Sequence, residues 1–420
     1  MPAADRSALF YTLLLKDLGC SSNAAKMCWL FGADDRQVKH DLKTINWSRM
    51  TESFKFAWRS VAPGSRPLQR ALKFAAMMRQ GPEGARKLVE TRCERGADIT
   101  RMLQLPEATA EGIRSLDEHW DGSGHPSRLW HEEIPLFSRI AGIAQTFEVF
   151  LASEGLSKAY AVLRERRGTW FDPKLVDDCM TFQGDAGFWN VLASDRAREE
   201  LSRWEPRDEV RWASEEDFDR ICLAFAQVVD AKSPWTFRHS QGVAEIAVGI
   251  ARSMGYDEVM LRDIRRAGLL HDIGKLGVSN LILDKPGKPT DEEFVQIRKH
   301  PDYTERILRQ VGSFSSLADV AASHHERLDG RGYHRRLNPD RFPALGQLLA
   351  VADIFEALSA KRPYRDAMPR EKIYEILDRD AGVGLCADCI VALKTSQEQN
   401  ATVSRVESQL DAIEQLVQQI

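Results

Sequence analysis

The chain has 420 residues, of which 43% are hydrophobic, so it is long enough for two or three packed domains. Its 58 Lys and Arg against 62 Asp and Glu give a formal charge of −4, which excludes a general basic footprint for DNA or anionic membranes. The sequence has no apolar run near the roughly 20 residues that span a bilayer and no signal-peptide pattern, so we expect a soluble, cytoplasmic protein without membrane partners.

The pattern of hydrophobic residues predicts an all-α fold. Apolar side chains recur at helical spacing over residues 217–232 and again over 243–254, where Gly255 ends the pattern. Two-residue alternation, which is typical of strands, is hard to find. Seven cysteines, an odd number, indicate reduced thiols rather than a disulfide framework.

The first half of the chain repeats a pattern of the second half. Residues 14–19 align with the segment that begins at Leu269, at an offset of 255 residues. Further on, the offset is 208, with Glu118 aligned with Glu326, Asp121 with Asp329, Gly122 with Gly330, and Phe147-Glu148 with Phe355-Glu356. The sequence therefore predicts two copies of one fold.

The first copy lacks the residue types that bind metals. At the positions of His271, His300, His324, His325 and Asp353 it carries Lys16, Arg92, Leu116, Asp117 and Gln145. Only Asp17 keeps the residue of its counterpart, Asp272. We interpret residues 1–200 as a degenerate, catalytically inactive copy that serves packing, dimerisation or sensing. Residues 201–215, with Pro206 and many charges, are predicted to be a linker.

The second copy, residues 216–400, concentrates imidazoles and carboxylates around the segment Ala-Gly-Leu-Leu-His-Asp-Ile-Gly-Lys. Taken alone, a His-Asp pair is more often an ordinary polar pair than a metal site. The joint set favours a metal centre and consists of His239, His271, Asp272, His300, His324, His325 and Asp353. His334 is interpreted as a surface loop residue.

This mixture of ligands suits Fe, Mn, Zn or similar divalent ions, and a carboxylate such as Asp272 can bridge two of them. Two ions roughly 3.5–4 Å apart form a clamp for in-line displacement at phosphorus, so we expect hydrolysis of a phosphoester. Lys275 lies four residues beyond His271, on the same helical face if the helix continues, and is predicted to contact a phosphate oxygen.

Residues 216–380 resemble an HD-GYP domain of the HD phosphohydrolase superfamily. The motifs Phe-Arg-His-Ser, Leu-Leu-His-Asp-Ile-Gly-Lys, Leu-Asp-Lys-Pro-Gly-Lys-Pro-Thr, His-Pro, His-His-Glu-Arg-Leu-Asp-Gly-Arg-Gly-Tyr, Val-Ala-Asp and Arg-Pro-Tyr-Arg stand in order. The first copy resembles a degenerate version. The resemblance implies tandem HD-type helical bundles, two or three metal ions, often iron or manganese, and hydrolysis of cyclic di-GMP to linear pGpG or on to GMP.

The resemblance also implies roles for individual residues. One metal would be held by His239, His271, Asp272 and Asp353, and Asp272 would bridge to a second metal held by His300, His324 and His325. Asp272 and Lys275 would be catalytic. Substrate would be bound by Lys275, Tyr333, Arg362 and Arg365.

Two positions depart from the family pattern. The Gly-Tyr-Pro motif is Gly332-Tyr333-His334, so the loop lacks its rigid proline. Members with three metals carry a Glu one helical turn before the first His, where this chain has Trp235. We therefore predict two divalent ions, iron or manganese.

The tail, residues 401–420, has an apolar seam at alternating steps of three and four residues. The seam predicts an amphipathic helix that either forms a coiled coil or packs on its own domain. A homodimer could form through this helix or through the first copy.

Three functions are compatible with the sequence. The favoured one is a metal-dependent phosphodiesterase of a cyclic dinucleotide, with cyclic di-GMP as the first candidate. The second is a nucleotide-binding regulatory protein with little turnover, suggested by the altered Gly-Tyr-Pro motif and the degenerate first copy. The third is a di-iron enzyme of the HD fold that acts on another phosphoester or activates oxygen.

Overall fold

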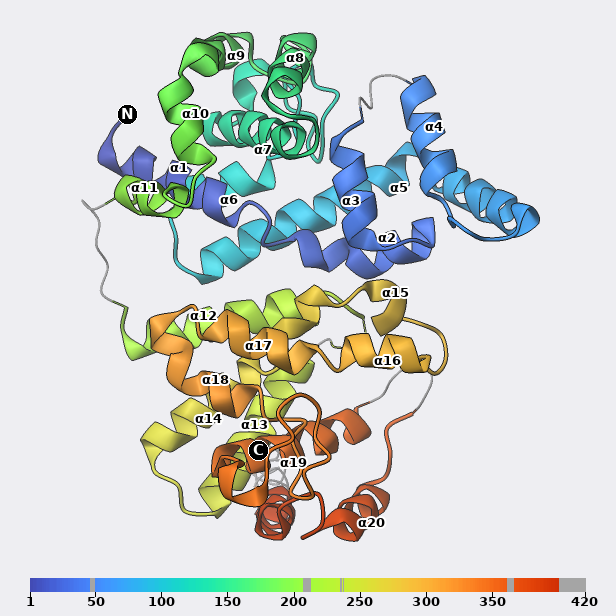
Figure 1. Cartoon of the computed structure of the whole chain (residues 1–420), viewed down its shortest axis with the longest axis vertical. Helices are drawn as coiled ribbons and strands as arrows, with labels where there is room; N and C mark the ends of the chain where they lie inside the picture. The colour runs from blue at the N-terminus through green and yellow to red at the C-terminus, as the bar shows by residue number, and fades with distance from the viewer. Residues whose placement is uncertain (46–49, 207–212, 235, 237, 361–365, 400–420) are drawn as a thin grey trace, which may run out of the picture. The chain divides into compact units, whose positions relative to one another are not determined.

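The computed structural model describes residues 1–45, 50–206, 213–234, 236, 238–360 and 366–399 (Figure 1). Within these residues the regular structure is helical, with three isolated β-bridges and no strand, which confirms the predicted all-α class. The chain divides into two compact units, Met1–Ala224 with Ser279–Leu281 and Phe225–Val278 with Ile282–Ile420. Each unit is described separately.

The first unit is built of eleven labelled α-helices and three short 3-10 helices. The α-helices are α1 (Ala3–Leu15), α2 (Ala24–Phe31), α3 (Asp35–Lys43), α4 (Met50–Ser60), α5 (Pro67–Met102), α6 (Glu107–Arg114), α7 (Leu136–Glu154), α8 (Leu156–Arg166), α9 (Pro173–Met180), α10 (Ala186–Leu192) and α11 (Ala197–Trp204). The 3-10 helices are η1 (Cys20–Asn23), η2 (His131–Glu133) and η3 (Thr181–Gly184). Helix α11 extends to Trp204, so the predicted linker begins as helix rather than as irregular chain.

The second unit follows from α12 (Glu215–Asp230), which runs across the boundary between the units, as α15 (Asn280–Leu283) also does. Its further α-helices are α13 (His239–Ser253), α14 (Glu258–Leu270), α15 (Asn280–Leu283), α16 (Asp291–Ile297), α17 (His300–Leu308), α18 (Ser315–Ala321), α19 (Ala344–Ser359) and α20 (Arg370–Asp380), and a last helix covers 387–399. The 3-10 helices are η4 (Ile273–Gly277), η5 (Gly312–Phe314) and η6 (Pro339–Arg341). The predicted C-terminal helix, 401–420, lies outside the described residues.

The core of the second unit forms where α13 packs against α14 and α19. Helix α14 begins at a side-chain cap, because the Asp257 carboxylate accepts a hydrogen bond from the Met260 N–H. Its buried face carries Leu261, Ile264 and Leu270 at helical spacing. Helices α13 and α19 therefore pack against α14. The segment His271-Asp272 follows directly after the end of α14 at Leu270.

The two units repeat the same helical arrangement. Helix α1 shifted by 255 residues coincides with α14, and α7 shifted by 208 residues begins where α19 begins. The packing repeats as well, because α1 contacts α6 and α7 as α14 contacts α18 and α19, and η1 contacts α5 as η4 contacts α17. The structure thus confirms tandem HD-type bundles, with the first copy degenerate.

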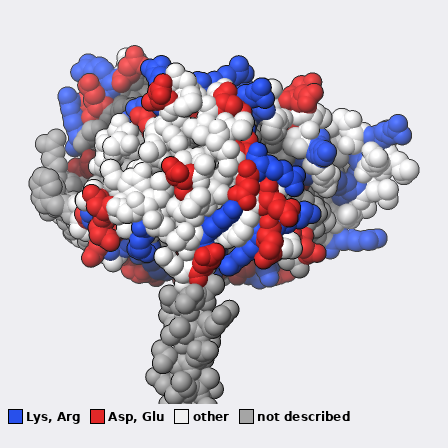
Figure 2. Space-filling model, turned by 90° about the horizontal axis from the view of Figure 1, so that it is seen from below, with Lys and Arg blue, Asp and Glu red and all other residues white. Residues whose placement is uncertain are grey.

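Charge is mixed on the surface that Figure 2 presents. Lys and Arg side chains lie among Asp and Glu side chains on that face instead of forming a patch of one sign. In the described part of the chain, none of the helices combines the length and the apolar character needed to cross a bilayer. Neither observation points to a nucleic-acid footprint on that face or to a spanning helix.

Candidate metal centre

Three histidine rings at the ends of helices lie close together in the second unit. His271 follows α14, His300 opens α17 and His324 follows α18. In each ring Nδ1 lies 2.6–2.7 Å from the carbonyl oxygen three residues earlier, that of Gly268 for His271, Ile297 for His300 and Ala321 for His324. A ring that donates through Nδ1 presents Nε2 as its free ligand atom, so the backbone sets the tautomer that metal binding needs.

The predicted ligands gather into three overlapping groups. In each group the candidate ligand atoms lie within 4.8 Å of one another. The groups are His239 with His271 and Asp353, His271 with Asp272 and His324, and His300 with His324 and His325. All seven side chains named from the sequence therefore converge on one centre.

Asp272 stands between two sets of imidazoles. Its Oδ2 lies 3.5 Å from His239 Nε2 and 3.4 Å from His271 Nε2. Its Oδ1 lies 3.4 Å from His300 Nε2 and 3.8 Å from His324 Nε2. A carboxylate with one oxygen toward each set could serve as a ligand on both sides if metal ions were bound there.

The protonation of the ligands also fits a metal centre. Burial lowers the pKa of His300 and His325 to about 3 and the pKa of His324 well below its usual range, so these rings are neutral. For Asp272, burial opposes ionisation, but Lys275 and His271 outweigh it and hold the pKa of the carboxyl well below its usual range. Neutral imidazoles around an ionised carboxylate are the forms that bind metals.

Two of the remaining candidate ligands, His239 and His271, lie beside carboxylates that raise their pKa. Burial disfavours the charged form of His239 and His271, but Asp272 and Asp353 outweigh it and raise the pKa of both rings. His271 Nε2 and Asp272 Oδ1 are buried without a hydrogen-bond partner in the described chain. Buried polar atoms of this kind require a partner, and a divalent cation would satisfy both.

Glu356 contacts a candidate ligand but was not among the residues named from the sequence. Its carboxylate accepts a hydrogen bond from His239 Nδ1, so it orients the ring toward Asp272 and Asp353. Gly242, one turn into α13, allows this approach because a Cβ there would lie 3.0 Å from Glu356 Cγ. The repeat aligned Glu356 with Glu148 but gave no sign of the contact with His239, which is 117 residues away.

Replacing Glu356 by Gln is expected to weaken metal binding by about tenfold to a hundredfold, because ligand-orienting carboxylates have effects of that size. Metal content after dialysis against a graded chelator series would measure the change. Glu148→Gln, the same change at the aligned position of the first copy, is the control and should leave metal content unaltered. Equal retention by Glu356→Gln and the wild type would contradict the orienting role.

Lys275 reaches the centre by a different route from the one predicted. Helix α14 ends at Leu270, and the 3-10 helix η4 carries Lys275 instead of a continued α-helix. The ammonium group donates to Asp272 Oδ2 and its side chain is 22% exposed. The α-helix therefore does not continue to Lys275 as we predicted. The lysine side chain nevertheless lies beside Asp272 and keeps access to solvent.

Tyr333 forms one edge of the site. Its ring lies 4.4 Å from the His325 ring, centroid to centroid, and the Arg298 guanidinium lies 5.0 Å from its ring centre. Arg298 was not named from the sequence, and it adds a cation beside the tyrosine. The other two predicted substrate contacts, Arg362 and Arg365, and also Trp235, lie outside the described residues.

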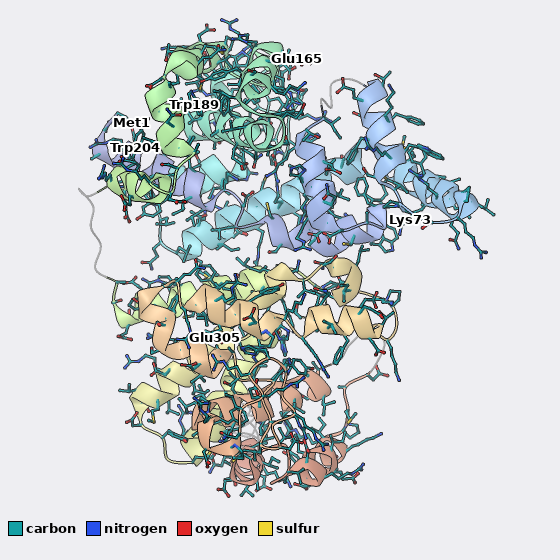
Figure 3. The ribbon with its side chains drawn as sticks, in the orientation of Figure 1. Met1, Lys73, Glu165, Trp189, Trp204 and Glu305 are labelled. Carbon is teal, nitrogen blue, oxygen red and sulfur yellow. The ribbon has the colours of Figure 1, made fainter. Side chains whose placement is uncertain are left out.

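The loop that carries Tyr333 is held by contacts with two glutamates where the family motif has a proline. His334 Nε2 lies 3.2 Å from Glu305 Oε2 on α17, where Figure 3 labels Glu305. The Glu326 carboxylate accepts backbone hydrogen bonds from Arg335 and Leu337 at 3.0 and 2.9 Å. His334 is therefore a half-buried anchor of the loop rather than the surface residue that we expected.

The aligned place in the first unit is lined with ion pairs. Arg92, at the position of His300, pairs with Asp117, and Lys16, at the position of His271, pairs with Asp17. Lys43 and Lys16 outweigh the effect of burial and lower the pKa of Asp17 to about 2. Lysine and arginine side chains stand where the second unit has histidines, and the nearby carboxylates are engaged in ion pairs, so this place is not built to hold a metal ion.

Comparisons with known proteins agree with this geometry. The family model for the HD domain matches residues 79–175 and 224–385. The chain is 42% identical, over 92% of its length and 84% of the relative, to 3′3′-cGAMP-specific phosphodiesterase 3 of Vibrio cholerae. It is 36% identical to a cyclic di-GMP phosphodiesterase of Thermotoga maritima, over 42% of this chain and 48% of that one.

A solved structure resembles the chain over almost its whole length. The crystal structure of the cyclic GMP-AMP-specific phosphodiesterase V-cGAP3 of V. cholerae aligns with a TM-score of 0.61 and 36% identity, covering 95% of this chain and 88% of that one. The likeness therefore includes both helical units and extends beyond the metal-binding half.

Proposed function

The chain belongs to the HD-domain family and is a phosphohydrolase of cyclic dinucleotides, and we propose that 3′3′-cGAMP is the substrate that it prefers. The proposal differs from the first candidate of the sequence resemblance, cyclic di-GMP. It is supported by the relative named as specific for 3′3′-cGAMP, which matches 92% of this chain, whereas the cyclic di-GMP phosphodiesterase of T. maritima matches 42%.

The position of Asp272 is the observation that carries the proposed mechanism. Its two oxygens face separate pairs of histidines, so we assign one ion to His239, His271 and Asp353 and the other to His300, His324 and His325, with Asp272 between them. We propose two divalent ions, iron or manganese. Bound there, they would lower the pKa of water and neutralise charge on the phosphodiester.

The protein's own groups orient and hold the substrate. Lys275, beside Asp272 and partly exposed, is placed to donate a hydrogen bond to a phosphoryl oxygen. Tyr333, next to His325, offers an aromatic surface for a base, and Arg298 adds a positive charge. In the overall reaction, one water adds to phosphorus and one P–O bond breaks, which gives a linear dinucleotide; a second round would give mononucleotides.

The deciding experiment compares substrates with one enzyme preparation. Full-length protein loaded anaerobically with Fe(II) or Mn(II) would be given 3′3′-cGAMP and cyclic di-GMP separately, and the products would be separated by chromatography. We expect kcat/KM for 3′3′-cGAMP to exceed that for cyclic di-GMP by about tenfold, equivalent to about 1.4 kcal/mol of transition-state discrimination. Metal analysis should give two ions per chain.

Each of the other possible results would contradict a different part of the proposed function. A higher kcat/KM with cyclic di-GMP would restore the sequence-based candidate. Two metals without turnover of either compound would favour another phosphoester or oxygen activation. Binding of a cyclic dinucleotide with little turnover and less than one metal per chain would favour a regulatory protein.

A further inference from the structure

The degenerate first unit contains a cavity of about 860 Å³ at the place that aligns with the metal centre. We propose that this cavity binds an uncharged, largely apolar small molecule that carries N–H or O–H hydrogen-bond donors. Its volume lies in the range of small-molecule sites in proteins, about 300–1,000 Å³. The proposal goes beyond catalysis, because every lining residue belongs to the first unit.

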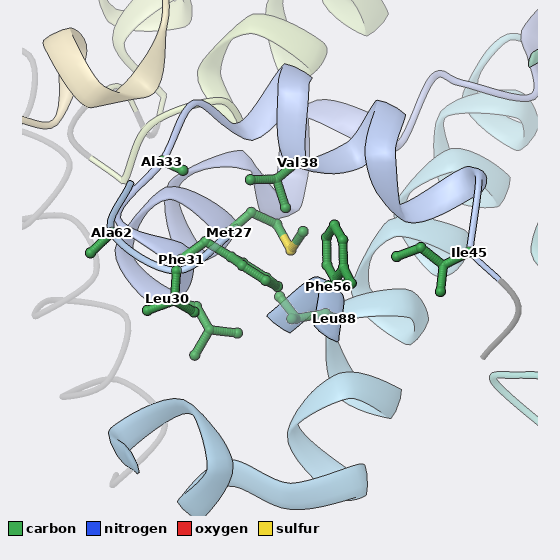
Figure 4. Close-up of a cluster of buried hydrophobic side chains, with 10 residues drawn as sticks. Met27, Leu30, Phe31, Ala33, Val38, Ile45, Phe56, Ala62 and Leu88 are labelled. Atoms are coloured by element: carbon green, nitrogen blue, oxygen red, sulfur yellow. The ribbon is translucent and has the colours of Figure 1, made fainter. Parts of the chain in front are cut away.

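The walls of the cavity are mainly hydrophobic. Figure 4 shows buried side chains of α2, α3, α4 and α5 gathered together, and several of them line the cavity. They include Met27, Leu30, Phe31, Phe56 and Leu88, with Phe54 and Met77 beside them. Methionine and aromatic side chains adapt to apolar ligands of irregular shape, so these walls favour an apolar body.

The Lys and Arg cations that line the cavity already have partners. Five cations face it, and each lies within 4.0 Å of a carboxylate of the same unit. The pairs are Arg36 with Asp34, Lys39 with Asp35, Lys43 with Asp17, Arg92 with Asp117 and Arg139 with Asp172. A phosphate or carboxylate ligand would have to break such pairs, so the cavity selects against anions, cyclic dinucleotides included.

Two buried acceptors indicate which polar groups the ligand should carry. Among the described residues, Asn23 Oδ1 and Gln145 Oε1 find no hydrogen-bond partner, and the two side chains belong to residues that are only 7% and 8% exposed. Both residues line the cavity. An acceptor that is removed from water calls for a donor, so a ligand with N–H or O–H groups would satisfy them.

Gln145 differs chemically from the residue at the aligned position of the second unit. It stands at the position of Asp353, a proposed metal ligand in the second unit. An amide in place of a carboxylate exchanges a cation ligand for a neutral hydrogen-bonding group. Together with the paired charges, this exchange turns the polar end of the cavity from a metal site into a site for neutral donors.

The test uses three matched naphthalenes and the full-length, metal-loaded protein. By titration calorimetry, 2-naphthamide, which is neutral and carries N–H donors, should bind once per chain. The anion 2-naphthoate and the donor-free methyl 2-naphthoate should each bind about tenfold more weakly or not at all, since each leaves the buried acceptors unsatisfied. Saturating 3′3′-cGAMP should not displace the amide.

Gly142 provides a variant that fills the cavity without disturbing the helix. It lies in α7 and lines the cavity, and a Cβ there would meet only the Leu116 carbonyl oxygen at 3.5 Å. Leucine is also a better helix former than glycine. We expect Gly142→Leu to weaken 2-naphthamide binding by about tenfold or more, because the side chain occupies ligand volume.

Ala152→Leu is the control, because Ala152 is an exposed residue of the same helix and does not line the cavity. This variant should bind the amide as the wild type does. The proposal would be overturned by 2-naphthoate binding as tightly as the amide, by unchanged binding in Gly142→Leu, or by no amide binding at all, which would leave the cavity to water. These readouts do not depend on turnover, so failure here leaves the proposed enzymatic function standing.

Discussion

Asp272→Asn is expected to lower kcat by about 10³-fold or more and to remove at least one of the two metal ions, because the residue is placed to bridge both sites. The carboxylate is 1% exposed and faces four imidazoles and the ammonium group of Lys275. The amide has nearly the same shape but no charge, so it cannot neutralise two cations at once. Turnover of 3′3′-cGAMP and metal content of the same preparation would measure the loss.

Asp17→Asn is the matched control, since Asp17 is the aligned aspartate of the first copy. Asp17 pairs with Lys16 and Lys43 in a centre that we expect to hold no metal. The control should therefore retain the metal content of the wild type. If Asp272→Asn kept both metals and hydrolysed the substrate, the bridging assignment would be wrong.

Helix positions could be predicted because most helices here have one buried face. Periodicity alone placed helices over 217–232 and 243–254, and the structure has α12 at Glu215–Asp230 and α13 at His239–Ser253. The start of α13 was missed because His239 and Ser240 are polar although both are buried. Their burial depends on contacts with Glu356 and Asp230, which the local sequence does not reveal.

The candidate ligands could be named from the sequence because few roles other than metal binding bring so many imidazoles and carboxylates together, and the structure places these side chains near one another. The arrangement could not be named. In each of three histidines, Nδ1 contacts the carbonyl oxygen three residues earlier, which is a property of helix ends. Glu356 orients His239 through the packing of one helix against another. Arg298 was missed because an arginine two residues before a histidine is not a distinctive pattern.

The first copy shows a second limit. Loss of the metal ligands followed from the alignment of Lys16 and Arg92 with histidines, and the structure supplies the ion pairs that satisfy these cations. The cavity did not follow, because α4 and the first part of α5 help to line it. These segments lie between residue 19 and Arg92, where the offset between the copies changes from 255 to 208, so the second copy offers no full counterpart for them. The sequence of the first unit indicated that it lacks metal ligands, whereas its cavity could be recognised only from the packing of its helices.

Gly274→Ala is expected to destabilise the second unit by about 3 kcal/mol and to displace a metal ligand, because the new methyl group has no room. A Cβ at Gly274 would lie 1.9 Å from the His300 carbonyl oxygen and 2.7 Å from the Thr304 backbone nitrogen. The Gly274 N–H also donates to Thr304 Oγ1, which in turn donates to the His271 carbonyl. Separation of η4 from α17 would therefore move His300 away from His271.

Two further glycine variants make this prediction specific. Gly19→Ala creates the same 1.9 Å overlap in the first unit, with the Arg92 carbonyl, so it should destabilise the protein to a similar degree but keep the metal. At Gly312 the added methyl group meets nothing within 4 Å, so Gly312→Ala should change stability by only about 0.5 kcal/mol.

Denaturant unfolding would measure stability, and metal analysis of the folded protein would measure the site. The expected pattern is loss of stability in both Gly274→Ala and Gly19→Ala, with loss of metal in Gly274→Ala alone. Such a pattern would mean that one packing contact is kept in both copies for stability, while in the second copy it also sets the distance between two metal ligands. Metal loss in Gly19→Ala, or full metal content in Gly274→Ala, would contradict that separation of roles.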